Sequence, residues 1–320
     1  MRDLIVLHEP GESSFGKRPE DRSVPELLKA GVINLDKPQG PTSHQVSAWV
    51  RDLLGLQKAG HAGTLDPRVS GVLPVALESA TRALEAMLVG DKEYVGVLQV
   101  HQDVDEARVR AMMSEFVGEI YQTPPVRSAV KRELRTRTIH ELEPIEHDGR
   151  LTLFRARCES GTYIRTLCND IGDALGTGAH LADLRRTRTA SFQEKESVSL
   201  NALKDAFVLW KEEGEESAIR GIVKPLERML VHLPAIVVKD TAVDALCHGA
   251  SLAMPGVAKL DRGIRKGDLL AIYSAKGEGV ALMDAAVDAN AIVDLKSGIA
   301  ATSRRVLMEP GTYPKLWKRD

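Results

Sequence analysis

The sequence predicts an α+β protein. Its larger domain has a mixed, mainly antiparallel sheet with flanking helices, and a small β-rich domain follows at the C-terminal end. Strand-like and helix-like segments succeed one another without the regular strand–helix–strand alternation of a parallel sheet. After Leu233 the pattern changes to short strands separated by tight turns. The chain has 320 residues, 43% of them hydrophobic, which is enough for two domains with separate cores.

The elements of the larger domain follow from the spacing of its apolar residues. The polar segment 8–30 predicts an extended arm with little regular structure. A helix is expected to begin at Ser43, which caps it, and to end at Gly55. Another helix is expected to begin at Thr162 and to end at Gly176. The expected strands are 32–35, 71–77, 93–100 and 151–158, and a further helix carries Val109, Met112, Met113 and Phe116.

The smaller domain is expected to follow a charged, solvated run at 211–216. Residues 235–238 and 269–273 have the composition of strands, and turn signals flank the second of them. A short helix is expected at 242–246.

Composition limits the classes of function. The net charge is −2 and the pI about 6.5, so a nucleic-acid-binding role would require positive charge gathered in patches. The cysteines Cys158, Cys168 and Cys247 are odd in number and far apart, which predicts neither a disulfide framework nor a zinc site. A reducing cytoplasm fits best, and neither a signal peptide nor a membrane span is expected.

The most informative segment is Gly-His-Ala-Gly-Thr-Leu-Asp-Pro-Arg-Val-Ser-Gly at 60–71. Small residues let the backbone approach a bulky ligand, and an Asp-Pro pair fixes a turn that presents the carboxylate. Taken alone, such a pair is usually an ordinary turn. Together with its continuation at 73–82, the run closely resembles the catalytic segment of TruB-type pseudouridine synthases. Within that family it resembles the RNA-guided, dyskerin-like branch of H/ACA ribonucleoproteins, in its archaeal form.

The resemblance implies that Asp66 is the catalytic aspartate. Pseudouridine formation breaks the N-glycosidic bond of a uridine, turns the uracil and rejoins it through C5, so no cofactor and no metal is expected. A carboxylate can attack as a nucleophile or remove a sugar proton, and both routes remain open. Either route needs an ionised carboxylate, which a nearby cation would favour.

Further matched segments imply the rest of the site. In Glu159–Leu167, similar to the family's SGTYIRTL segment, Arg165 would pair with Asp66 and Tyr163 would contact substrate. In Lys92-Glu93-Tyr94, Tyr94 would lie against the uracil and assist the late proton transfer at C5. His61 would fill the space of an extruded base, and Leu184 would pack near the uracil. Ordinary alternatives are an exposed helical arginine, a strand tyrosine and a satisfied loop histidine.

Basic residues predict the RNA contacts. Residues 127–137 contain five basic residues and one acidic residue, and this stretch resembles the dyskerin-like branch rather than stand-alone bacterial enzymes. The arginines near Leu184 could serve phosphates, unless they form a solvated basic turn. The C-terminal segment resembles a PUA domain, a pseudo-barrel that holds the ACA end of a guide RNA. The expected RNA contacts are Arg127, Lys131, Arg132, Arg135, Arg137, Arg185, Arg186, Arg188, Lys239, His248, Gly249, Pro255 and Gly256.

The resemblance divides the chain into an N-terminal arm (1–30), a pseudouridine-synthase domain (31–230), a PUA domain (233–310) and a tail (311–320). It implies isomerisation of uridines in rRNA, and of a TΨC-loop uridine in tRNA without a guide. The implied partners are guide and substrate RNA, a small zinc-binding subunit, a glycine/arginine-linked small subunit and a kink-turn-binding ribosomal-type protein. The alternatives are a stand-alone tRNA pseudouridine synthase and a non-catalytic RNA scaffold.

Overall fold

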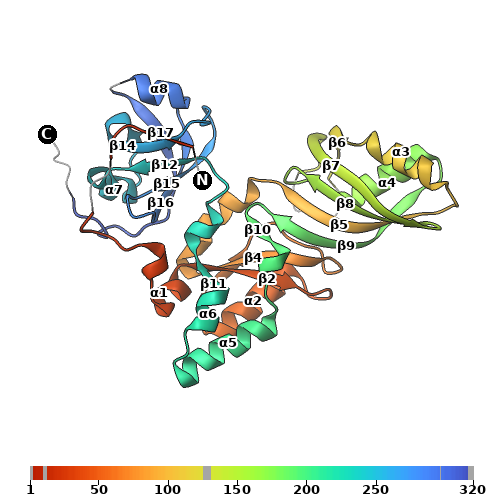
Figure 1. The fold of residues 1–320 in the computed structure, drawn as a ribbon, viewed down its shortest axis with the longest axis horizontal. Helices are drawn as coiled ribbons and strands as arrows, with labels where there is room; N and C mark the ends of the chain where they lie inside the picture. The colour runs from red at the N-terminus through yellow and green to blue at the C-terminus, as the bar shows by residue number, and fades with distance from the viewer. Residues whose placement is uncertain (1–2, 10–12, 125–130, 296, 316–320) are drawn as a thin grey trace.

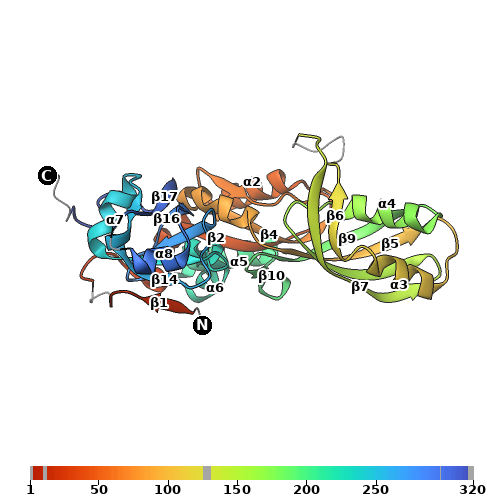
Figure 2. The same ribbon diagram turned by 90° about the horizontal axis from the view of Figure 1, so that it is seen from above.

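The computed structural model describes residues 3–9, 13–124, 131–295 and 297–315. Two sheets follow one another along the molecule, with α3 (Glu106–Ser114) and α4 (Ile164–Leu175) at the end remote from the C-terminal sheet (Figures 1 and 2). Among the described strands, β4 pairs with β9 and β12 with β15 in parallel, and the other strand pairs are antiparallel. The predicted α+β class with a mainly antiparallel sheet is therefore confirmed.

The larger sheet has the strand order β11-β2-β4-β9-β5-β8-β7-β6, with β3 added to β4 and β10 added to β9. The predicted strands all lie within members of this sheet. Its strands are β2 (Gly31–Lys37), β3 (Ala59–His61), β4 (Ser70–Leu77), β5 (Lys92–Val100), β6 (Gly118–Gln122), β7 (Arg135–Asp148), β8 (Leu151–Cys158), β9 (Ala179–Thr189), β10 (Phe192–Gln193) and β11 (Val223–Pro225). Its helices are α1 (Val24–Lys29), α2 (Ser43–Leu54), η2 (Glu78–Leu88), α3, α4, α5 (Leu200–Glu213) and α6 (Ser217–Ile222).

The smaller sheet has the order β1-β14-β12-β15-β16-β17-β13. Helices α7 and α8 pack against it in one apolar cluster. The strands predicted at 235–238 and 269–273 and the helix predicted at 242–246 all form. Its elements are β1 (Leu4–Val6), β12 (Ala235–Val238), α7 (Asp240–Cys247), β13 (Leu252–Ala253), η5 (Met254–Gly256), β14 (Val257–Asp261), β15 (Leu269–Tyr273), β16 (Gly279–Ala285), α8 (Ala289–Asp294) and β17 (Ile299–Val306).

The capping residues of two helices differ from the prediction. The cap of α2 is Thr42, whose side chain accepts from the backbone N–H of Gln45 at 3.1 Å. The Ser43 hydroxyl instead bonds both backbone groups of Leu65, at 2.9 and 3.0 Å, and so ties the helix to the residue before Asp66. The α4 helix begins after Tyr163, whereas the Thr162 hydroxyl donates to a backbone carbonyl outside the helix.

The N-terminal arm is more ordered than its composition suggested. Its residues form α1, and β1 pairs with β14 in the C-terminal sheet. The arm also bridges the two sheets, because Arg22 makes two 2.8 Å contacts to Glu227, which accepts in addition from the backbone N–H of Gly279 at 2.9 Å. One apolar cluster contains residues of both sheets, among them Val72 and Leu282. The two domains are thus packed into one body.

Among the described residues, none of the helices has the length and apolar character that crossing a membrane requires.

Candidate active site

The loop that carries Asp66 joins β3 to β4 and is held in place by the buried ammonium group of Lys37. Lys37 at the end of β2 is fully buried, and its Nζ donates to carbonyl oxygens of three prolines. Burial lowers the pKa of Lys37, and the carboxylate of Asp66 opposes this shift. The lysine thereby ties the turn after β2 to the residue that follows Asp66. Its acceptors are Pro38 (2.8 Å), Pro41 (2.9 Å) and Pro67 (3.4 Å).

Asp66 and Arg165 meet although 99 positions separate them in the sequence. Arg165 lies in the first turn of α4, and its Nη2 contacts Oδ2 of Asp66. Both side chains are more than half exposed, 57% for the arginine and 55% for the aspartate. An ion pair so exposed contributes about 1 kcal/mol or less to stability, so its main effect is to orient the carboxylate.

The apolar neighbours of this pair explain why it forms. Leu65 precedes Asp66 and Ile164 precedes Arg165, and both are buried in one core cluster. Leu184 of β9 belongs to the same cluster, and Tyr94 of β5 packs against it. The structure therefore brings the segments of Asp66, Tyr94, Arg165 and Leu184 together, as the resemblance implied for a single site.

Tyr94 of β5 is partly buried and packs against the apolar core cluster. In the strand register it stands opposite Arg186 on β9 and Ala156 on β8. Burial raises the pKa of Tyr94, whereas the Arg186 guanidinium opposes this rise by its charge and by a hydrogen bond. The phenol is thus held next to a buried cation.

His61 is half-buried at the end of β3. Its Nδ1 lies 3.0 Å from the Ser47 hydroxyl, and its ring meets His44 edge-on with 4.6 Å between ring centroids. Burial, together with His44 and Arg186, lowers the pKa of His61 to about 4. The ring is therefore neutral near pH 7. It lines a hollow of about 650 Å³ beside Lys58, Arg82 and Arg305.

The start of α4 is held by a residue that the sequence did not single out. Gln122 of β6 is 2% exposed and bonds both backbone groups of Tyr163, accepting from its N–H at 2.9 Å and donating to its carbonyl at 3.1 Å. This double contact fixes the turn from which Arg165 projects. No sequence signal linked the two, because 41 positions separate Gln122 from Tyr163.

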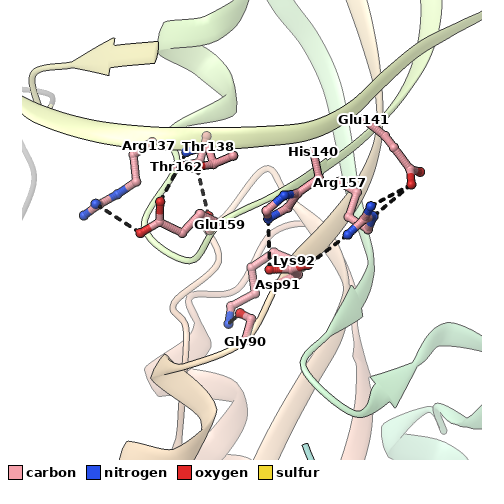
Figure 3. A network of polar contacts seen from close by, with 10 residues as sticks. All are labelled: Gly90, Asp91, Lys92, Arg137, Thr138, His140, Glu141, Arg157, Glu159 and Thr162. Atoms are coloured by element: carbon pink, nitrogen blue, oxygen red, sulfur yellow. Dashed lines mark hydrogen bonds and ion pairs between the residues drawn. The ribbon is translucent and has the colours of Figure 1, made fainter. Parts of the chain in front are cut away.

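A polar network stabilises the start of β5, two residues before Tyr94 (Figure 3). Asp91 accepts from Nε2 of His140 at 3.1 Å and from Nη1 of Arg157 at 3.0 Å. Lys92 is buried, and its Nζ donates to the carbonyl oxygens of Met87 (3.0 Å) and Gly90 (2.8 Å). Burial, with a smaller effect of Arg186, lowers the pKa of Lys92 to about 8.

The prediction that Arg186 serves RNA phosphates is wrong. The segment is a strand rather than a basic turn, and its alternation places Leu184 and Arg186 inside. Arg186 is 1% exposed, and its Nε donates to the carbonyl of Val72 at 2.9 Å. Arg185 is also engaged internally, because it pairs with Asp36 at 2.9 Å and with Glu194. Arg188 is half-buried.

The other basic residues are distributed unevenly. Arg127 lies outside the described residues. Lys131 and Arg132 are exposed, although Lys131 pairs with Glu133. Arg135 and Arg137 are half-buried at the start of β7, and Arg137 contacts Glu159 at 3.4 Å. These side chains remain predicted RNA contacts.

The predicted contacts of the C-terminal domain lie along α7 and η5. The backbone N–H of Lys239 donates to the carbonyl of Gly256 at 2.9 Å, which joins the two segments. His248, Gly249 and Pro255 are exposed around them. Their role in RNA binding also remains a prediction. Over the described ranges, no cluster of three histidine, cysteine or acidic residues is arranged to hold a metal ion.

Comparison with known proteins matches this arrangement to one family. Residues 51–164 match the model of the TruB family pseudouridylate synthase N-terminal domain, and 165–231 match that of the tRNA pseudouridylate synthase B C-terminal domain. Residues 8–47 match the DKCLD (NUC011) domain and 234–307 the PUA domain. A probable tRNA pseudouridine synthase B of Methanopyrus kandleri is 54% identical, over 99% of this chain and 94% of the relative. The chain belongs to the TruB family of pseudouridine synthases.

Within this family, the chain is similar to archaeal proteins along its whole length. A probable tRNA pseudouridine synthase B of Pyrococcus abyssi is 51% identical, over 99% of this chain and 96% of the relative. A chain in the crystal structure of a Cbf5-Nop10-Gar1 complex is 49% identical, with a TM-score of 0.95 over 99% of this chain and 97% of that one. A chain in an H/ACA RNP bound to a substrate RNA containing 2′-deoxyuridine is 46% identical, with a TM-score of 0.92 over 99% and 98%. The predicted pseudouridine-synthase sheet with a C-terminal PUA module is confirmed.

Proposed function

We propose that this pseudouridine synthase isomerises specific uridines of RNA as the catalytic subunit of an H/ACA ribonucleoprotein. The observation that carries the proposal is the contact between Asp66 and Arg165, in a chain that aligns over 99% of its length with the Cbf5-Nop10-Gar1 structure. Leu184 lies in the apolar cluster that contains Leu65 and Ile164, the neighbours of this pair, and Tyr94 packs against that cluster. Such a site offers a carboxylate, an orienting cation and an apolar wall for a flat base.

In the proposed reaction, Asp66 acts on the ribose of the target uridine, either at C1′ or by removal of a sugar proton. The bond from C1′ to N1 breaks, the uracil turns and a bond from C1′ to C5 forms. The proton on C5 leaves, and N1 ends protonated. Arg165 orients the carboxylate, Tyr94 assists the loss of the C5 proton, and Tyr163, Leu184 and His61 hold or replace bases.

The proposed partners follow the solved relatives, which were crystallised with Nop10, with Gar1 and as an H/ACA RNP with a substrate RNA. We expect this chain to bind a guide RNA and subunits of these kinds, and also a kink-turn-binding protein. We place the RNA contacts at exposed and partly exposed residues of two regions, and we place the particle in the cytoplasm, which suits three free, buried cysteines. These residues are Lys131, Arg132, Arg135, Arg137, Arg188, Lys239, His248, Gly249, Pro255 and Gly256.

We also propose that function divides along the chain as the sequence suggested, with an arm at 1–30, a catalytic domain at 31–230, an RNA-binding domain at 233–310 and a tail at 311–320. The family models support this division, because the match to the catalytic family ends at 231 and that to the PUA domain begins at 234.

A stand-alone activity on tRNA is the second candidate, because similar archaeal proteins are named probable tRNA pseudouridine synthase B. The test is single-turnover release of tritium from C5-labelled uridine. A guided substrate and a tRNA transcript would each be treated with the isolated chain and with the chain reconstituted with guide RNA and small subunits. We expect guided conversion to rise strongly on reconstitution. Equal conversion of the guided substrate in both states would refute the guided role and leave the tRNA activity.

A further inference from the structure

Arg186 lies behind the proposed site rather than on the RNA-facing surface. It is among the largest fully buried side chains and stands in register with Gly71 on β4 and Tyr94 on β5. It thus touches two of the segments that carry the proposed chemistry.

The guanidinium also reaches the loop of Asp66. A Cβ built on Gly63 would lie 3.1 Å from Nη1 of Arg186, so a larger residue there would require the guanidinium to shift by a few tenths of an ångström. Gly63 has a φ of +68°, which likewise favours glycine. The guanidinium therefore fills the space between the backbone three residues before Asp66 and the side chain of Tyr94.

The charge of Arg186 has no carboxylate partner among the described residues. Its Nε donates to a carbonyl, and its buried Nη2 has no hydrogen-bond partner there. Lys92 is also buried, its Nζ donates to two carbonyl oxygens, and it adds a second positive charge nearby. Burying a cation is strongly unfavourable unless an anion or a full set of acceptors compensates it. The ionisable group that acts on the charge of Arg186 is the Tyr94 hydroxyl, and Tyr94 stands opposite Arg186 on the neighbouring strand.

We propose that Arg186 is a positioning residue of the isomerisation, which holds Tyr94 beside the Asp66 loop and supplies the buried positive charge that stabilises the phenolate form of Tyr94, the form that accepts the C5 proton. The proposal rests on the proposed function, in which Tyr94 assists that step. Because burial keeps the pKa of Tyr94 above its ordinary value, only a small fraction of the phenol has lost its proton to solvent water near neutral pH, and Arg186 stabilises this phenolate. When the C5–H bond of the rejoined base breaks, its electron pair returns to the ring and the proton passes to the phenolate oxygen. Arg186 keeps its proton throughout.

A purely structural arginine would fill the same space without acting through Tyr94. The two roles differ in the ionisation of residue 94. If Arg186 acts by its charge, Arg186→Gln must make the phenol harder to ionise, since the guanidinium opposes the rise in the pKa of Tyr94. A structural role predicts lower stability with unchanged ionisation.

The first experiment measures ionisation directly and does not depend on activity. 3-Fluorotyrosine is placed at position 94 of the full chain, and its ¹⁹F shift is titrated with pH in the wild-type background and with Arg186→Gln. Arg155→Gln is the control, because this arginine lies on the adjacent β8 and its side chain is 45% exposed. We expect the pKa of the probe to rise by about one unit or more with Arg186→Gln and to stay unchanged in the control. An unchanged probe in both variants would overturn the proposal even if the protein is an active synthase.

The second experiment is a double-mutant cycle on single-turnover conversion by the reconstituted particle, with Tyr94→Phe, Arg186→Gln and the double variant. We expect Arg186→Gln to slow conversion at least tenfold and to move the rising limb of the rate–pH profile to higher pH. In the Tyr94→Phe background, adding Arg186→Gln should change the rate of conversion less than threefold. Multiplying effects would show that Arg186 does not act through Tyr94. If Arg186→Gln does not fold, Arg186→Lys takes its place. In that case, fluorotyrosine at position 94 of the wild-type protein must also move the rising limb of the rate–pH profile to lower pH.

Discussion

Replacing Arg165 by lysine keeps a positive charge near Asp66 but removes the planar group that orients it. The pair is more than half exposed on both sides, so the loss in free energy of unfolding should be about 1 kcal/mol or less. For a chain of this size, that corresponds to a fall in Tm of about 3 °C or less. A misaligned carboxylate should reduce the rate far more, by about 100-fold, which is the usual effect of removing one pre-oriented electrostatic contact from an active site.

The assay pairs tritium release from C5-labelled uridine under single-turnover conditions with a thermal melt of the same preparation. Arg155→Lys serves as the control, because its ion pair with Glu143 is similarly exposed and lies on β8, away from Asp66. We expect normal melting with slow turnover for Arg165→Lys and no change in either for the control. A turnover rate within threefold of wild type would remove Arg165 from the site. A fall in Tm of more than 5 °C would show that the exposed pair is structural.

Further predictions concern other parts of the structure. Asp66→Asn should abolish isomerisation, measured by tritium release, but leave RNA affinity unchanged in filter binding, since phosphate contacts dominate affinity. A comparable loss of activity and of affinity would contradict this. Gly63→Ala should cost about 1–2 kcal/mol of stability from its positive φ and also slow turnover by displacing Arg186, whereas Gly55→Ala, with open space at its Cβ, should affect stability alone. Glu227→Gln should lower the free energy of unfolding in urea by about 3 kcal/mol, because Arg22 loses its ion-pair partner in a largely buried position; the exposed Glu143→Gln should have little effect. Because the folded pKa of His61 is about 4, the unfolded chain binds a proton between pH 6.5 and 4 that the folded chain does not. Stability should therefore fall as pH falls through this range, and His61→Gln should flatten that slope in urea titrations at pH 7 and pH 5.

The sequence predicted those parts of the site that lie in contiguous motifs. Asp66, Tyr94 and Arg165 each stand beside an apolar residue with regular spacing, so their elements could be assigned and the resemblance could bring them together. Gln122 could not be found in this way, because its role depends on β6 meeting the start of α4.

Two errors came from signals that the sequence did contain. Thr42 and Gln45 form a capping box one residue before the predicted cap, which left the Ser43 hydroxyl free to bond Leu65. Along β9, an inward Leu184 also places Arg186 inward, since side chains alternate in a strand. Because the segment is rich in arginine, its composition indicates an RNA-binding stretch, and this interpretation leaves the alternation out of account. What no local pattern could show is that β4 and β9 pair in parallel and so enclose the arginine.

The solvent exposure of the side chains at the proposed site explains why a partner should be needed. Leu184 and Arg186 are buried and Tyr94 is partly buried, whereas the Asp66 and Arg165 side chains are open to solvent. An exposed ion pair is screened by water, and its electrostatic effect on a reacting ribose is weak until water is excluded. The open side can be covered by the substrate itself only if the RNA is held rigidly against it. A guide duplex clamped by further subunits would do this, and a flexible single strand would not. We therefore expect reconstitution of the particle to raise the rate at which bound substrate is converted, and not merely the affinity for the substrate. Saturating the isolated chain with substrate RNA should not restore the rate, and a full recovery at saturation would refute this reasoning.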